Sequence, residues 1–397
     1  MEAHHSMISV IEALNHVLAL AKPLAAEPIA LEHAVDRILA QAVIADRNQP
    51  PFAASAMDGY AVSAADLSVG RKKWNVIGEA AAGHKFDSPV GVGQATRIFT
   101  GAPMPLGTDH VLIQEHVTAE CGSITITEGP NDKAHVRPAG GDFAVGYELT
   151  APRRLTPQDI ALMASMNLSH PMLSCKPQVA IIATGDELVQ PGETPREDQI
   201  IASNTYGLAA MLQRVGAETR ILPIARDRLG SLAEAFALTK GADLIITIGG
   251  ASVGDHDLVA QAAVEFGMLQ SFYKVAMRPG KPLMAGHMAD IPIIGLPGNP
   301  VSAMVCGEVF VVPLVQKMLG LPSGPRERLS APLARDLPAN GPREHYMRGK
   351  IIGGTLDVEQ RQDSSLLTVL NSANVLVVHQ ANAPALPRGT LVDYISL

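Results

Sequence analysis

The chain has 397 residues, of which 47% are hydrophobic and 18% are charged, and this composition excludes a disordered protein. The length predicts about two to four domains. The net charge is −8 and no run of Lys and Arg is long enough to follow a phosphate backbone, so we expect no nucleic-acid partner. Three cysteines without C-x-x-C spacing exclude a disulfide scaffold. The chain has no secretory signal pattern and no apolar run of roughly 18 residues, so we expect a cytoplasmic protein without a membrane partner.

The first part of the chain predicts a helical stem. Apolar residues recur with helical spacing over 10–18, and LEHAVDRILA predicts a second short helix. Further along, Thr156, Pro157 and Asp159 have the types and spacing of a capped helix start. We therefore assign residues 1–45 and 146–176 to one helical stem domain.

The segment between the two parts of the stem differs in character. Frequent Gly and Pro separate short runs of strand-like sequence, at 74–77, 95–99, 110–113 and 123–127. Residues 46–145 therefore predict an inserted, mostly-β domain.

From residue 177 to 324 strand and helix patterns alternate, which predicts a doubly wound α/β domain with a mostly parallel sheet. The predicted strands are 179–183, 219–224, 244–248, 271–276 and 291–294. The predicted helices are 204–215, 229–239, 257–266 and a long one from about 300. Residues 325–397 cluster β-branched residues between turns and predict a small C-terminal β domain. The expected fold class is multidomain α/β.

Ligands bind open parallel sheets beyond the carboxyl ends of the strands, and acidic residues gather there in this sequence. Thr184, Gly185, Asp186 and Glu187 follow the first predicted strand, and Asp227 follows the second. One such carboxylate would often be a helix cap. Several acidic loops on one edge favour a binding site.

A glycine-rich loop, GGASVGDHD, follows the third strand. Gly249, Gly250 and Gly254 allow the backbone to approach a ligand closely, and a helix starting within the loop would present free amides to an anion. Ser252 can donate to a phosphate oxygen, and Asp257 can bind a metal or cap the helix. The alternative is a tight strand-to-helix turn without a ligand.

Residues 250–254 also satisfy G-x-S-x-G, the nucleophile elbow of serine hydrolases. Asp290 with His345 or His379 could complete a triad with Ser252. No HGGG-type oxyanion sequence precedes the serine, and the elbow leaves the acidic loops unexplained. A hydrolase is the remote alternative.

Basic residues follow further along the same edge. Lys274, Arg278 and Lys281 lie within eight residues, which suits a phosphorylated ligand, although a solvated basic edge is the simpler reading. Pro297 and Pro300 stiffen the adjacent GLPGNP loop. The sequence has no Walker A motif.

Eight motifs in order then resemble the molybdopterin molybdenumtransferase family, which includes MoeA and the E domain of gephyrin-like proteins. They are SAMDGYA, TGAPMP, RPAGGDF, TGDEL, SNTYGL, GGASVGDHD, RPGKPL and GLPGNPVSA. The resemblance implies an elongated, four-part protomer and a homodimer whose active cleft lies between the α/β domain of one protomer and the inserted domain of the other. It also implies transfer of molybdenum from molybdate to adenylated molybdopterin, with release of AMP.

The resemblance assigns roles to residues. Asp58, Thr100 and Asp142 are implied to face the partner's ligand site, although each also lies in an ordinary turn pair. Glu187, Asp227 and Asp257 are hard oxygen donors suited to Mg²⁺, and they are also the candidate catalytic carboxylates.

The remaining assignments concern the substrates. The glycine loops and the three basic residues are implied to bind the phosphates, and Arg348 in HYMRGK to help hold molybdate. Ser364, in the loosely matching segment RQDSSLLTVL, is a further candidate substrate-binding residue. Arg278 stands where relatives often have lysine. Other proteins of cofactor synthesis or molybdoenzyme maturation are further candidate partners. The main alternative is a scaffold protein on the same fold.

Overall fold

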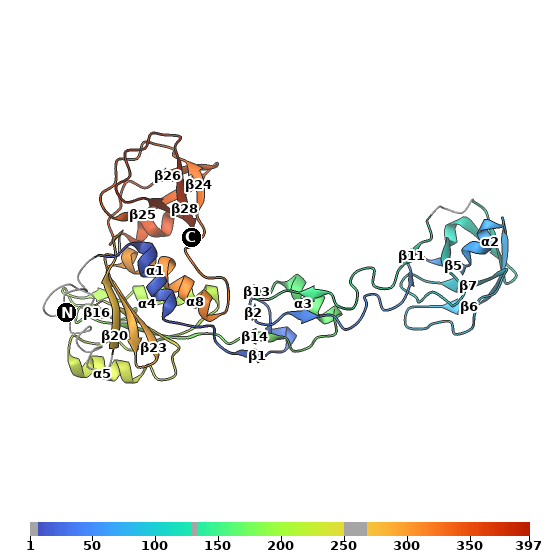
Figure 1. Ribbon diagram of the computed structural model, residues 1–397, viewed down its shortest axis with the longest axis horizontal. Helices are drawn as coiled ribbons and strands as arrows, with labels where there is room; N and C mark the ends of the chain where they lie inside the picture. Colours follow the sequence, from blue (N-terminus) through green and yellow to red (C-terminus); the bar gives the residue numbers. More distant parts are fainter. Residues whose placement is uncertain (1–6, 129–132, 250–267) are drawn as a thin grey trace.

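The structure is a computed structural model that describes residues 7–128, 133–249 and 268–397. Figure 1 shows an elongated molecule: the α/β and C-terminal parts lie at one end, a small sheet lies in the middle, and the inserted β part lies at the far end. The expected fold class is confirmed. What matters for function is which elements this shape places together and which it separates.

The α/β part is built on a six-stranded sheet in the order β18-β15-β19-β23-β22-β20. The first four are parallel, and β22 and β20 form an antiparallel pair at one edge. Their bounds are β15 Gln178–Ala183, β18 Glu218–Ile221, β19 Leu244–Ile248, β20 Met268–Lys274, β22 Pro282–Met288 and β23 Ile291–Leu296. The sequence predicted five of these strands; β22 was not predicted.

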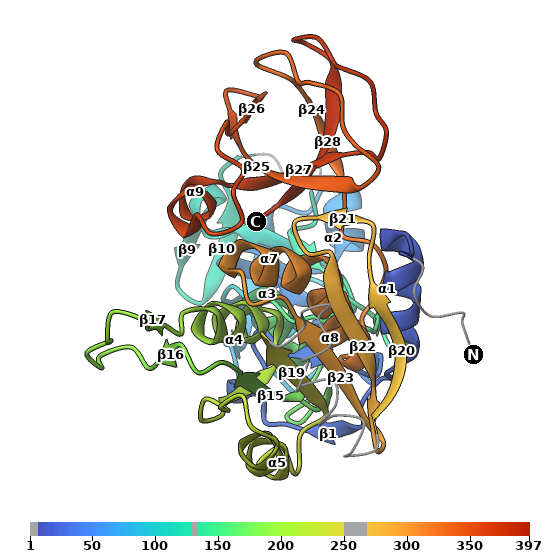
Figure 2. The same cartoon turned by 90° about the vertical axis from the view of Figure 1, so that its left-hand side faces the viewer.

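Alternating side chains of this sheet fill two cores. Val179 and Ile181 of β15 face a large cluster with helices α1, α4, α7 and α8, whereas Ala180 and Ile182 face α5 (Figure 2). The helices are α1 Val10–Ala19, α4 Asn204–Val215, α5 Leu229–Ala237, α7 Pro300–Cys306 and α8 Val312–Met318, with a π-helical turn at Gly307–Val311. Burial on both faces explains the uninterrupted apolar runs of the central strands.

One stretch of the described residues, Pro300–Met318, is long and apolar enough to cross a membrane. However, 83% of its most apolar window is buried inside the protein. This stretch packs in the large hydrophobic core of the α/β part.

The middle part differs from the expected helical stem. It contains the predicted helix α3 (Pro157–Ser165), with the Thr156–Asp159 capping box in place, but it is built on a four-stranded sheet. The strands are β1 Ala26–Pro28, β2 Ile38–Leu39, β13 Arg153–Arg154 and β14 Met172–Ser174. Only Leu31–His33 of the predicted second helix is helical, and it is a 3-10 turn.

The first helix is present as predicted, but α1 packs on the α/β domain rather than in the middle part. Its apolar residues Val10, Leu14 and Val17 lie in the large α/β core, and it contacts α8, β20 and β22.

The inserted part forms a six-stranded sheet in the order β8-β5-β7-β6-β10-β9, with the short helix α2 (Ala64–Ser68). Its strands are β5 Gly59–Val62, β6 Lys73–Ala80, β7 Gln94–Ile98, β8 His110–Ile113, β9 Val117–Glu120 and β10 Ser123–Ile126. Two short strand pairs connect it to the middle part: β4 Ala54–Ser55 with β11 Val136–Arg137, and β3 Val43–Ile44 with β12 Glu148–Leu149. The four predicted strand runs of this segment are confirmed.

The C-terminal part is a β domain joined directly to the α/β part. Its strands are β24 Leu329–Pro332, β25 Glu344–Ile352, β26 Thr355–Val358, β27 Val375–His379 and β28 Leu391–Ser396, with α9 Leu367–Ser372. The short strand β21 (Met277–Arg278) of the α/β part pairs with the start of β25 and so extends this sheet. The RPGKP loop is thereby fixed between the two domains.

Candidate active site

The acidic loop and the glycine loop flank the point at which the order of the sheet reverses. The chain passes from β15 outward to β18 and then returns to β19 on the other side, and this strand order predicts a ligand crevice outside the carboxyl ends of β15 and β19. The amide of Thr184 donates to the carbonyl of Ile248 at 2.9 Å, so the ends of the two strands are held together.

Carboxylates cluster beside this crevice. An Asp186 oxygen accepts a hydrogen bond from the amide of Asp227 at 3.2 Å, which joins the loop after β15 to the loop after β18. The pKa of Asp227 is raised by burial and by the negative charges of Asp186 and Glu187, while Arg226 opposes these effects. The structure therefore brings together all the predicted acidic residues that it describes in the α/β part.

Gly185 is required by this geometry. Its φ is +148°, and a Cβ at this position would collide with the Glu187 carboxylate, which folds back over it. Only glycine lets the backbone and the carboxylate approach so closely.

The centre of the edge is formed by glycine and proline. The amide of Gly249 donates to the carbonyl of Leu296 at 3.1 Å, so the glycine loop starts beside the PGNP loop. Gly249 has φ +93°, and a Cβ there would meet the carbonyl of Thr184 at 2.7 Å. Pro300 is the first residue of α7, as its fixed φ favours, and Pro297 is buried just before it.

The predicted basic residues lie toward the other end of the edge. Lys274 ends β20 and pairs in register with Pro282, and β22 runs antiparallel to β23. The loop between β20 and β22 therefore lies at the same edge as the acidic loops. Arg278 and Lys281 of this loop are exposed and Lys274 is half-buried.

Acidic and basic groups thus lie on the same side of the sheet, where the parallel strands end, but at opposite ends of the row of strands. At about 4.8 Å between neighbouring strands, β18 and β20 lie roughly 24 Å apart. The arrangement suits an extended ligand that contacts a carboxylate cluster at one end and cations at the other end.

The C-terminal domain adds a buried cation to the basic end. Arg348 is fully buried, and its Nη2 donates to the carbonyls of Asp363 at 2.8 Å and Arg361 at 3.4 Å. Its Nε and Nη1 have no partner in the described part of the chain. The backbone carbonyl of Ser364 accepts a hydrogen bond from the amide of Val301 in the first turn of α7, so this loop lies against the PGNP region.

The surroundings of Arg348 carry an excess of positive charge. Burial, together with Arg278, Arg348, His379 and Arg343, lowers the pKa of His345 to about 3, so this histidine is neutral at physiological pH. Buried donors without partners in a positive environment are the chemistry of an anion site.

A second group of predicted residues lies elsewhere in the same chain. Asp58, beside β5, accepts hydrogen bonds from the amide and the hydroxyl of Thr100 at 2.8 Å each. These bonds and the nearby Arg97 lower the pKa of the Asp58 carboxyl. Asp142 is exposed, with its amide bonded to the carbonyl of Gln49. Figure 1 places the inserted sheet at the opposite end of the molecule from the α/β edge.

Four predicted residues, Gly250, Ser252, Gly254 and Asp257, lie outside the described residues, as does the predicted helix 257–266. The hydrolase alternative also names Asp290, which lies in the turn between β22 and β23. That turn is at the amino end of β23, and Gly249 follows the carboxyl end of the adjacent parallel strand. Asp290 therefore lies at the opposite end of the sheet from Gly249.

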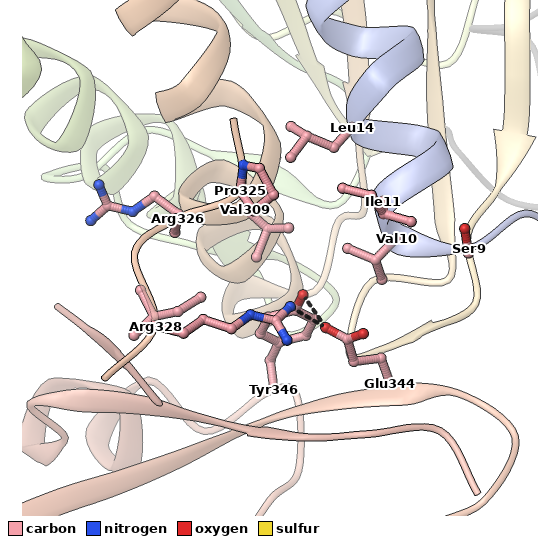
Figure 3. A pocket seen from close by; sticks show the side chains of 11 residues that line it. Ser9, Val10, Ile11, Leu14, Val309, Pro325, Arg326, Arg328, Glu344 and Tyr346 are labelled. Carbon is pink, nitrogen blue, oxygen red and sulfur yellow. Dashed lines mark hydrogen bonds and ion pairs between the residues drawn. The ribbon is translucent and has the colours of Figure 1, made fainter. Parts of the chain in front are cut away.

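The pocket drawn in Figure 3 is not the predicted site. It lies between α1, the π-helical turn and the C-terminal sheet, with Val10, Ile11 and Leu14 on one wall. Glu344 accepts hydrogen bonds from Arg328 at 2.8 Å and from the Tyr346 hydroxyl at 2.6 Å. These contacts lie within the C-terminal domain, and Tyr346 also packs in the large α/β core with Val10 and Leu14.

Sequence reasoning missed two residues that hold the site loops. Asn204 donates from Nδ2 to the carbonyl of Gly298 at 2.7 Å, and Arg226 donates to three carbonyls of the acidic loop. Asn204 lies in the SNTYGL motif and Arg226 directly precedes Asp227. Local spacing gives no sign of carbonyl partners this far away in the chain.

Comparisons with known proteins agree with this architecture. Three family regions match in order: the MoeA N-terminal region (domains I and II) over residues 8–167, the probable molybdopterin binding domain over 180–317, and the MoeA C-terminal region (domain IV) over 330–397.

Relatives and a solved structure cover most of the chain. The molybdopterin molybdenumtransferase of Haemophilus influenzae is 36% identical over 79% of this chain and 78% of its own. That of Bacillus subtilis is 32% identical over 96% and 91%. A crystal structure of the molybdopterin biosynthesis MoeA protein of Pyrococcus horikoshii superposes with a TM-score of 0.88 at 27% identity, covering 98% of this chain and 99% of the other. The chain therefore belongs to the molybdopterin molybdenumtransferase family, whose members are transferases of molybdenum cofactor biosynthesis.

Proposed function

We propose that this protein inserts molybdenum from molybdate into adenylated molybdopterin and releases AMP in a Mg²⁺-dependent reaction. The observation that carries the proposal is the division of the carboxyl edge into an acidic end at Asp186, Glu187 and Asp227 and a cationic end at Arg278 and Arg348. An adenylated pterin carries a phosphoanhydride, and molybdate is itself an oxyanion. Both ligands therefore require hydrogen-bond donors such as those at the cationic end.

The acidic end is suited in kind to Mg²⁺. Within 7–128, 133–249 and 268–397 no group of three or more His, Cys, Asp or Glu side chains is placed to hold a metal ion. Magnesium usually takes one or two carboxylates and completes its shell with water and substrate phosphate oxygens. Glu187 and Asp227, with Asp257 as a further candidate, would hold the ion, which would neutralise charge on the phosphoanhydride.

The protein's own groups have separable tasks. The amides around Gly249 and the basic residues Lys274, Arg278 and Lys281 bind phosphate oxygens, and the rigid Pro297 and Pro300 fix the loop between them. Arg348 offers two unpaired donors to molybdate, next to Ser364. In the reaction, water adds across the phosphoanhydride P–O bond, so that AMP leaves and the pterin keeps its own phosphate. The two dithiolene thiols replace one oxygen of molybdate, which leaves with their two protons as water.

The inserted domain is assigned to the site of a second protomer. Asp58 and Thr100 form a hydrogen-bonded pair at the far end of an elongated chain. From there they cannot reach the carboxyl ends of the α/β strands of the same protomer (Figure 1). A homodimer in which each inserted domain covers the partner's α/β edge gives these polar residues, and Asp142, a role.

The test is direct. Purified protein is mixed with adenylated molybdopterin, molybdate and Mg²⁺, and AMP is measured. We expect AMP release that requires Mg²⁺ and falls more than about 100-fold in Glu187→Gln, as for loss of an essential charged group. The control Glu197→Gln changes an exposed carboxylate nearby and should have wild-type activity. No AMP from folded wild-type protein would refute the proposal.

A further inference from the structure

A single arginine, Arg226, holds the acidic loop by hydrogen bonds to its backbone carbonyls. Nη1 of Arg226 donates to the carbonyl oxygens of Gly185 at 3.2 Å, Asp186 at 3.1 Å and Leu188 at 2.9 Å. Three carbonyls thus share the two hydrogens of one nitrogen. The guanidinium is half-buried and stays charged at any physiological pH.

The backbone of Arg226 is itself fixed. Its amide donates to the hydroxyl of Ser231 in the first turn of α5, at 2.9 Å, and the preceding residue Ala225 bridges in parallel to Thr184. The side chain therefore connects a rigid helix start to the loop that carries Asp186 and Glu187.

These contacts hold the loop through its carbonyl oxygens and form no ion pair with its carboxylates. Among the described residues Arg226 forms no ion pair within 4.0 Å, although Asp186, Glu187 and Asp227 are its neighbours in the site. Its charge still lowers the pKa of Asp227, against burial and the two other acids. A cation that binds carbonyls leaves the acidic oxygens free for a ligand and reduces their mutual repulsion.

We propose that Arg226 is a positioning residue for the acidic end of the site: it holds the peptide groups of residues 185–188 so that Glu187 presents its carboxylate, beside Asp227, to a divalent ion. The inference rests on the proposed function, because it concerns the metal-binding end of that site. Arg226 touches neither substrate nor ion and acts only through the loop.

The test uses the full-length protein with Arg226→Gln, Arg226→Lys and the control Arg228→Gln, in which an exposed arginine two residues away is changed. Binding of Mn²⁺, as a substitute for Mg²⁺, is measured by electron paramagnetic resonance. Hydrogen exchange of peptides covering 184–190 is measured by mass spectrometry. Loss of an outer-shell partner weakens metal binding about 10- to 100-fold, so we expect this loss of Mn²⁺ affinity in Arg226→Gln.

Exchange in 184–190 should rise in the same variant while the remaining α/β peptides exchange as in wild type. Arg226→Lys should recover part of both properties, since an ammonium can still donate to the carbonyls, and Arg228→Gln should match wild type. Wild-type Mn²⁺ affinity and exchange in Arg226→Gln would overturn the inference, as would exchange that rises throughout the domain. Wild-type protein that binds Mn²⁺ but releases no AMP would refute the proposed function alone.

Discussion

Nη2 of Arg348 donates to the carbonyl oxygen of Asp363 at 2.8 Å, and this contact ties a strand of the C-terminal domain to the loop that lies against α7. The guanidinium is fully buried, yet it forms no ion pair with a carboxylate in the described parts of the chain. Burial lowers the pKa of Arg348, and Arg278 lowers it further, whereas Asp363 raises it. A buried charge without a carboxylate partner costs stability, and this cost supports the proposal that Arg348 binds an anion.

We therefore predict that Arg348→Met separates stability from binding. Because the substitution removes an uncompensated buried charge, the variant should melt within a few degrees of wild type or higher. Molybdate at about 100 times its Kd should stabilise wild type by about 2.7 kcal/mol and the variant by nothing measurable. Thermal unfolding with and without molybdate measures both. Arg388→Met, an exposed change in the same domain, is the control, and equal stabilisation of Arg348→Met by molybdate would contradict the assignment.

Gly185→Ala should disable the acidic end while leaving the fold intact. The new Cβ would push the Glu187 carboxylate out of place, whereas Gly192→Ala introduces a side chain at φ +95° with no atom within 4 Å. Each change costs about 1–3 kcal/mol of backbone strain. We expect AMP release to be lost in Gly185→Ala and kept in Gly192→Ala, at similar melting temperatures. Equal activity of the two variants would show that the approach of Glu187 to Gly185 is unimportant.

His345 makes the fold sensitive to acid. Its pKa is lowered from 6.5 to about 3 in the folded protein, first by burial and then by neighbouring cations. Between these two values the unfolded chain binds the proton and the folded chain does not, so stability is complete above pH 6.5 and falls as the pH decreases. From pH 6.5 to 5 this residue should account for about 2 kcal/mol.

Urea unfolding of wild type and His345→Gln at pH 7.5 and pH 5 measures this contribution. The variant should lose less stability than wild type on acidification, because glutamine does not titrate. An identical loss in both proteins would mean that His345 is protonated in the fold.

The local pattern of the sequence was sufficient for much of the fold. The capping box at Thr156 and Asp159 gave the start of α3, and helix α4 ends at Gly216, which has φ +109°. In the α/β part, apolar runs between turn residues located the central strands. These features depend on neighbours within a few residues, which a sequence displays directly.

Long-range pairing could not be read in the same way. Ile38 and Leu39 lie in a helix-like pattern, but Leu39 pairs with Leu173 and Arg153, and Asp36 has a positive φ of 62° that is incompatible with a continuing helix. The sequence likewise predicts that the acidic and basic residues all lie at the carboxyl ends of the strands. The strand order shows that the two groups are at opposite ends of that row. The carbonyl contacts of Arg226 span 38 to 41 residues and leave no local signature.

The central claim is that one active site takes its α/β edge from one protomer and its inserted domain from the other. The direct measurement co-expresses two differently tagged chains, one with Asp58→Ala and one with Asp227→Ala, and assays AMP release by the purified mixed dimer. If the site is shared between protomers, one of the two sites in each mixed dimer is intact, and we predict about half of wild-type activity although each homodimer is inactive. Mixed dimers as inactive as both parents would contradict the claim.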